Sequence, residues 1–193
     1  MKKSKKPLTQ QYLSPENYIR QRARILPIHD CFVNSDWQDQ KLANIVVSRK
    51  HINGNITACF YLVDLNCLGI KDSDYVFNES YPSFQEILLK YSGNMDLIKI
   101  DYVLAHNIIY SGLEFAKEYG FTPHKVFQSV TRFMLEDDTD EIELLDIECG
   151  NDGKPIYIQG PYDDEATQNR IIAQLEKTAG TGNYEYLMGI GEE

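Results

Sequence analysis

Residues 42–65 read LANIVVSRKHINGNITACFYLVDL, in which two apolar runs flank a short polar stretch. Runs of β-branched and aromatic residues bounded by turn residues are typical of β-strands. The Asn53-Gly54 dipeptide favours a type I′ turn, because both residue types tolerate positive φ angles. The sequence therefore predicts a hairpin of residues 42–50 and 56–65. With a strand at 25–33, it forms a three-stranded antiparallel meander.

Helical spacing replaces the strand pattern on both sides of this meander. Ser14-Pro15 predicts the cap and first position of a helix that ends near Arg24. Further along the chain, a Ser83-x-x-Glu86 capping box predicts a second helix. A third is expected at about 95–119, where Ala105, Gly112 and Ala116 lie on its apolar stripe and predict close packing. Thr122-Pro123 starts a fourth helix, with Val126, Phe127, Val130, Phe133 and Met134 directed inward.

After Glu141, apolar and polar residues alternate again with a period of two, which is typical of a β-strand. Residues 142–149 and 155–159 are expected to form a second β-hairpin around the turn at 150–153. Asp163 and Asp164 cap a final helix through Ala179, followed by a strand at 184–188. No long linker divides the chain, so we expect an α+β fold with a single domain over residues 14–193, after a flexible basic tail at 1–13.

The 193-residue chain is acidic, with a formal net charge of −10 and a pI near 4.9. A binder of duplex DNA or RNA needs a basic face, so this balance argues against that class. The charges are uneven: Lys2, Lys3, Lys5 and Lys6 crowd the start, whereas residues 136–152 hold nine acidic residues and no basic ones. A contact between the 136–148 segment and a basic protein surface is one expectation.

The spacing of the cysteines indicates the cellular compartment. No two of the four form a CxxC pair: they are Cys31, Cys59, Cys67 and Cys149. Reduced thiols in the cytoplasm are the expected state. The longest apolar runs, such as residues 58–63, are far too short to span a bilayer.

Polar residues interrupt an apolar pattern at residues 62–74, and such a break is where a functional site is often found. Asp64 ends a predicted central strand, and Asp72 follows in the next turn, so either carboxylate suits a general base or a ligand of a divalent ion. His106 is the matching proton carrier if its helix faces Asp64. The structural alternative is that Asp64 caps the turn and pairs with a lysine or arginine.

Candidate binding residues accompany these three. Lys71 suits stabilisation of an anion, and Tyr110 and Glu114 follow His106 at helical spacing on one polar ribbon. His124 and Lys125 begin a helix, where backbone N–H groups favour a phosphate or a carboxylate. Simple solvent exposure is the alternative for this pair.

The cysteines and histidines suggest two further hypotheses, a zinc site and a reactive thiol. His29 and Cys31 share one face of a strand and would form a zinc set with Cys67 or His106, although zinc ligands usually come in close pairs. Cys67 near Lys71 would be a reactive thiol if exposed, and an inert one if buried. The sequence assigns neither a cofactor nor a metal.

Three segments together resemble an uncharacterised bacterial protein family. They are CLGIKDS (67–73), AHNIIYSGLEFAKEYGFTPHKVF (105–127) and IECGNDGKPIYIQGPYDD (147–164). The similarity covers about residues 25–188 and implies no reaction, cofactor or binding residue.

Two functions follow from these observations. The first is an intracellular binding or regulatory module that meets a basic protein surface or a small anionic ligand. The second is a hydrolase or nucleic-acid-processing enzyme built on Asp64, Asp72 and His106. The enzyme hypothesis requires these three side chains to meet in one pocket.

Overall fold

A five-stranded antiparallel sheet forms the centre of the computed structural model, which describes residues 13–187. The strand order is β4-β3-β2-β1-β5. The strands are β1 (Ile28–Asn34), β2 (Leu42–Lys50), β3 (Ile56–Asp64), β4 (Gly69–Glu79) and β5 (Leu97–Ile100). The expected α+β class is confirmed, but the three-stranded meander is only the middle of a wider sheet. The Lys-rich start of the predicted tail lies outside the described residues.

The predicted hairpin is present with almost its predicted bounds, since β2 pairs with β3 from Leu42↔Asp64 to Lys50↔Ile56. Its turn differs from the prediction. Gly54 has a φ of +87°, whereas Asn53 does not have a positive φ, so the loop is not a type I′ turn. The N–H of Gly54 donates to the His51 carbonyl, and the N–H of His51 donates to the Asn55 carbonyl. A five-residue loop with one left-handed position therefore closes the hairpin.

The two outer strands were not predicted. β4 pairs along most of β3, and its polar residues Asp72 and Asp74 obscured the strand pattern. β5 pairs with Cys31–Asn34 of β1, although these residues were assigned to the helix predicted at 95–119. That helix begins only after Asp101, whose side chain accepts a hydrogen bond from the Leu104 N–H. Asp101 is a typical N-cap, and it separates strand from helix.

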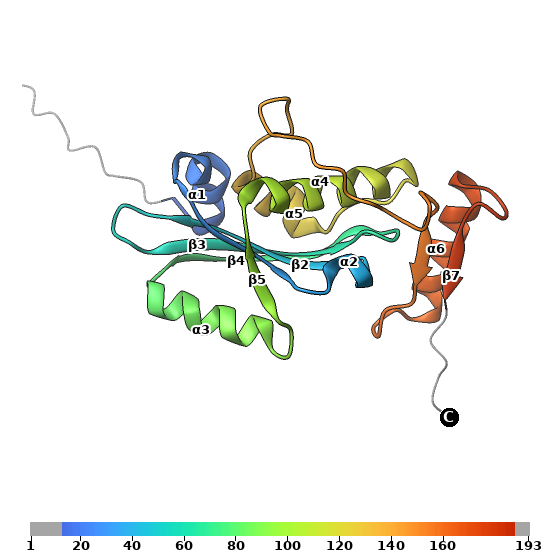
Figure 1. The fold of residues 1–193 in the computed structure, drawn as a ribbon, viewed down its shortest axis with the longest axis horizontal. Helices are drawn as coiled ribbons and strands as arrows, with labels where there is room; N and C mark the ends of the chain where they lie inside the picture. Colours follow the sequence, from blue (N-terminus) through green and yellow to red (C-terminus); the bar gives the residue numbers. More distant parts are fainter. Residues whose placement is uncertain (1–12, 188–193) are drawn as a thin grey trace, which may run out of the picture.

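Helices cover both faces of the sheet (Figure 1). Helix α3 (Tyr81–Ser92) lies on one face, and α1 (Pro15–Arg22), α4 (Tyr102–Glu118) and α5 (Lys125–Ser129) lie on the other. Short pieces complete this layer: η1 (Ala23–Ile25), α2 (Trp37–Gln40) and η2 (Thr131–Met134). The cap of α3 is Ser80, which accepts from the Ser83 N–H, so the predicted capping box was placed three residues too late. No helix among residues 13–187 has the length and apolar character needed to cross a membrane.

The C-terminal part contains β6 (Ile156–Ile158), α6 (Glu165–Thr178) and β7 (Glu185–Leu187). Asp164 caps α6 as predicted, but the second hairpin was wrong, because β6 pairs in parallel with β7. Residues 142–149 form no strand. The side-chain amide of Asn107, on α4, binds this segment: it donates to the Glu143 carbonyl and accepts from the Leu145 N–H. A side chain thus supplies the hydrogen bonds that a partner strand would supply.

Helix α4 approaches the β3–β4 turn closely, as the small residues on its stripe predict. A Cβ on Gly112 would lie 2.5 Å from Val63 Cγ1 and 3.2 Å from Leu65 Cδ2. Gly69 has a φ of +65°, and a Cβ there would lie 2.7 Å from Ala116 Cβ. Both glycines are therefore needed, one for each side of the contact.

We expect Gly112→Ala to destabilise the protein by about 1–2 kcal/mol, measured by urea denaturation. Overpacking a core costs about 1–3 kcal/mol, which outweighs the gain of about 1 kcal/mol in helix propensity. Ser111→Ala on the same helix is the matched control and should leave stability unchanged or slightly raised. Equal stability of Gly112→Ala and the unmodified protein would contradict the close contact.

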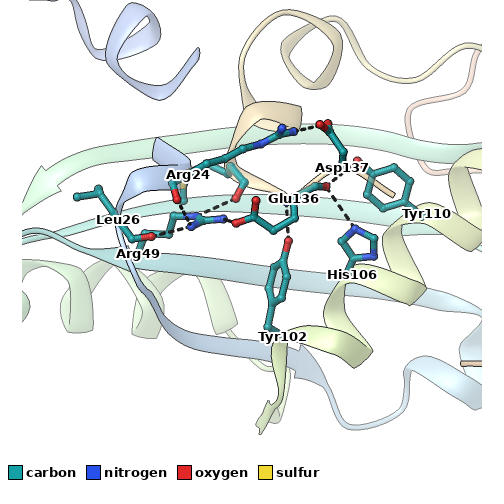
Figure 2. A network of polar contacts seen from close by, with 9 residues as sticks. Arg24, Leu26, Arg49, Tyr102, His106, Tyr110, Glu136 and Asp137 are labelled. Carbon is teal, nitrogen blue, oxygen red and sulfur yellow. Dashed lines mark hydrogen bonds and ion pairs between the residues drawn. The ribbon is translucent and has the colours of Figure 1, made fainter. Parts of the chain in front are cut away.

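A buried arginine joins the sheet to the segments above it (Figure 2). Arg49 on β2 is 2% exposed, and its Nε donates to the Met134 carbonyl at 2.9 Å. Its Nη1 donates to the carbonyls of Arg24 and Leu26, at 3.3 and 2.6 Å. Its Nη2 pairs with Glu136 Oε1 at 2.6 Å. One guanidinium thus fixes the ends of η1 and η2 on the sheet.

Arg49→Met should destabilise the protein by about 3 kcal/mol or more, because three buried carbonyl oxygens lose their donor. Arg22→Met, at an exposed position of α1, is the control for the loss of positive charge. Glu136→Gln should cost about 1 kcal/mol, since its amide oxygen still accepts from Arg49. Thermal unfolding of the three variants gives the comparison, and a mild effect of Arg49→Met would show that the network is not essential.

Candidate functional site

The Asp64 carboxylate is engaged in its own turn. Its Oδ1 accepts from the N–H groups of Asn66 and Cys67, at 2.9 and 3.1 Å. Its Oδ2 lies 4.0 Å from Lys71 Nζ. Burial raises the pKa of Asp64, while Lys71 and the backbone donors oppose that rise. This arrangement matches the structural alternative, a turn cap paired with a lysine.

Asp72 has a different neighbour, His124. Asp72 Oδ1 lies 3.4 Å from His124 Nδ1, and the Ser73 N–H donates to the same nitrogen at 3.2 Å. These two contacts exclude each other in any one protonation state, because Nδ1 cannot both accept and donate. In the neutral ring, Nδ1 accepts from Ser73, and Nε2–H is then the donor of His124.

His106 lies beside Glu136, which belongs to the Arg49 network (Figure 2). The ring of His106 is buried, stacks on Tyr110 with ring centroids 4.3 Å apart, and contacts the Glu136 carbonyl through Nε2 at 3.3 Å. Burial lowers the pKa of His106, which favours the neutral ring. Tyr110 donates to the same carbonyl. Within residues 13–187, no hydrogen bond or ion pair links His106 to Asp64 or Asp72.

The other predicted site residues outside the cleft described below also lie apart from one another. Glu114 pairs with Lys117 on the surface of α4, and Lys125 is exposed at the start of α5. Burial raises the pKa of the Cys67 thiol, which keeps this residue protonated rather than reactive. Across the described part of the chain, no three histidine, cysteine or acidic side chains gather closely enough to hold a metal ion. The zinc set on His29 and Cys31 therefore has no support.

Two predicted binding residues, Lys71 and His124, do come together. They line a cleft of about 450 Å³ between the sheet and α6. The floor is apolar and includes Leu68, Ile70, Phe121 and Ile171. The polar lining adds Thr122, Asp163, Thr167, Arg170 and Gln174.

The Lys71 side chain lies beside a tight turn at 160–163. A Cβ on Gly160 would lie 3.1 Å from Asp163 Oδ2 and 3.5 Å from Lys71 Nζ. Asp163 Oδ2 accepts from Tyr157 Oη at 3.0 Å and from the Gly160 N–H at 2.8 Å. Burial and then the hydrogen bond to Asp163 raise the pKa of Tyr157, so the phenol remains a donor. These bonds hold the Asp163 carboxylate in place.

Helix α6 supplies the opposite wall. Thr167, Arg170, Ile171 and Gln174 are spaced by three, one and three residues, which places them on one helical face. Gln174 Nε2 donates to the Tyr119 carbonyl at 2.8 Å and ties this face to the end of α4. Arg170 is exposed and forms no hydrogen bond or ion pair with any described residue, although its charge lowers the pKa of Asp164. The guanidinium is thus available to a ligand.

Asp163, Thr167 and Arg170 line this cleft but were not among the predicted site residues. Their helix and its cap were predicted, and the spacing of 167, 170, 171 and 174 was a signal that these residues share a face. What the sequence did not contain was the packing of this face against residues 68–71 and 120–124.

The acidic segment at 136–148 lies on the surface above α4. Three of its carboxylates pair with basic side chains: Glu136 with Arg49, Asp137 with Arg24, and Glu148 with Lys41. The other five, Asp138, Asp140, Glu141, Glu143 and Asp146, form no ion pair with the described residues and are exposed. Contact with a basic protein stays a prediction.

Comparisons with protein-family models, with curated proteins and with solved structures found no match to this chain. The resemblance to a bacterial family stays a prediction. The lining residues of the cleft are therefore the observations that bear on function.

Because Asp64 is buried, we expect its contribution to the stability of the fold to depend on pH. Its raised pKa means that the folded state binds a proton more tightly than the unfolded chain, whose Asp value is near 3.8. The resulting stabilisation is present below that pH and is lost as the pH rises through the folded pKa. Asp64→Asn should therefore gain stability relative to the unmodified protein as the pH rises from about 3.5 to 7.

Asp64→Ala is the companion variant and should lose about 1–2 kcal/mol, because two buried N–H groups lose their acceptor. Urea denaturation at several pH values measures both effects. If Asp64→Asn instead loses stability relative to the unmodified protein as the pH rises, the direction of the Asp64 shift is wrong.

Proposed function

We propose that this protein is a binding module whose cleft between β4 and α6 holds the anionic group of a small organic molecule. The observation that supports this proposal most strongly is the meeting of Lys71, His124 and Arg170 around one apolar floor. Charged and hydrogen-bonding groups around an apolar cavity are typical of small-molecule sites, and about 450 Å³ falls within their usual range.

Arg170 is the main anchor in this proposal. A guanidinium binds a carboxylate or a phosphate through two parallel hydrogen bonds, and no protein group among the described residues occupies it. The Thr122 hydroxyl donates no hydrogen bond to the described residues and adds a donor, whereas the Thr167 side chain already hydrogen-bonds the Asp164 carboxylate. The His124 ring adds its Nε2, since its Nδ1 is contacted by the Ser73 N–H.

The arrangement favours binding over catalysis. The proposed acid–base residues Asp64, Asp72 and His106 each have their own partners, and none of these contacts forms a nucleophile–base pair. The net charge of −10 also makes the two basic side chains of the cleft, Lys71 and Arg170, informative, because an acidic protein repels anions over most of its surface.

Arg170→Gln tests the anchor. We expect carboxylate or phosphate compounds with an apolar part to bind in the millimolar range or tighter, and Arg170→Gln to weaken this binding by about 10-fold. Isothermal titration with 4-methylpentanoate and with phenyl phosphate measures the affinities. Perturbed amide resonances of Lys71, Phe121 and Arg170 would locate the site.

Arg22→Gln is the matched control, since Arg22 is an exposed arginine on α1, which lies far from α6 (Figure 1). This variant should bind like the unmodified protein. Equal affinities for Arg170→Gln and the unmodified protein would sink the proposal.

A further inference from the structure

The cleft carries opposite charges along its α6 wall. Asp163 lies immediately before the N-cap Asp164, and Arg170 is the sixth residue of the helix. Side chains of a helix tilt toward its N-terminus, so the Arg170 side chain leans toward the Asp163 end. A carboxylate and a guanidinium are therefore offered to the same small volume.

The Asp163 carboxylate lines the cleft with one of its two oxygens unengaged within residues 13–187. Its Oδ2 is held by Tyr157 and Gly160, whereas its Oδ1 accepts no hydrogen bond from any described residue. The nearby Lys71 ammonium lies 4.0 Å from Asp64, and Asp163 has no ion-pair partner within 4.0 Å among residues 13–187. One lysine beside two carboxylates cannot neutralise both.

We propose that the ligand is a small zwitterion, of which a free α-amino acid with an apolar side chain is the simplest. This inference rests on the proposed function. The carboxylate of the ligand binds Arg170, and its ammonium donates to Asp163 Oδ1. The apolar side chain lies on Leu68, Phe121 and Ile171.

A purely anionic ligand leaves the Asp163 charge in the cleft without a cation beside it. Covering a carboxylate that has no ion-pair partner is costly, so such a ligand binds more weakly than one that brings an ammonium. A purely cationic ligand leaves Arg170 in the same position. The two charges thus act as a filter for molecules that carry both.

Matched ligands test this filter on the unmodified protein. L-Leucine carries both charges, 4-methylpentanoate is the same skeleton without the ammonium, and 3-methylbutylamine is the same skeleton without the carboxylate. L-Valine and L-phenylalanine with their corresponding analogues extend the series. At least one amino acid should bind about 10-fold or more tightly than both of its analogues in isothermal titration.

Asp163→Asn assigns the ammonium site. The new amide oxygen still accepts from Tyr157 and Gly160, so the turn is preserved while the charge is lost. The affinity for the amino acid should fall to that of its deaminated analogue, and the affinity for the analogue should not fall. Glu165→Gln, an equal charge change at an exposed position of α6, is the control and should change neither affinity.

The outcomes separate this inference from the proposed function. If 4-methylpentanoate and the other deaminated analogues bind as tightly as the amino acids and depend on Arg170, the zwitterion is wrong and the anionic site stands. If none of these compounds binds, both are wrong. An amino-acid preference that survives in Asp163→Asn would also overturn the role of Asp163.

Discussion

The guanidinium of Arg49 holds the two layers of this protein together. It is buried on a central strand, and its donors are used by carbonyl groups at the ends of η1 and η2 and by Glu136. Because η2 directly follows α5, this anchor also restrains the segment that begins at His124. Tyr61 and Ser73 reinforce it from the sheet through hydrogen bonds to Thr131. Side chains on β2, β3 and β4 thus fix one wall of the cleft.

The other constraint is the close approach of α4 to the β3–β4 turn. Glycine at 112 and 69 lets the helix lie against residues 63–69, and this contact shapes the turn that Asp64 caps. Lys71 leaves this turn with its ammonium beside Asp64 and reaches the cleft. A buried carboxylate with a structural role therefore also places a cation at the cleft. The polar residues within this apolar pattern lie beside the proposed binding site, although Asp64 itself acts through its turn.

The C-terminal unit completes the cleft from a distant part of the sequence. Cys67, Tyr157, Ile171 and Leu175 form a small hydrophobic cluster of their own, separate from the main core. Hydrogen bonds from Ile156 to Asn66 and from Gln174 to Tyr119 attach this unit to the sheet and to α4. Because the cleft lies at this junction, a ligand that contacts Lys71 and Arg170 contacts both parts. Binding at such a junction also stabilises the attachment of α6.

Local signals in the sequence determined the elements with clear ends. Ser14, Asp164 and the apolar runs of β2 and β3 gave correct bounds, because caps and alternation act over a few residues. β5 was taken for helix, and residues 142–149 were taken for a strand, because four-residue runs depend on which partner is nearby. Lys71 and His124 were predicted from local chemistry, but Asp163 and Arg170 were missed.

The sequence by itself determined the α+β class, the central hairpin, the capped helices and two cationic residues of the cleft. Only the tertiary structure decided that Asp64, Asp72 and His106 stay apart and that α6 faces Lys71. The physical reason is that a cap or an alternating strand is stabilised by neighbours within one or two turns of chain. The cleft instead needs residues about 100 positions apart in the sequence, such as Lys71 and Arg170, to lie around one volume, and only tertiary packing brings them there.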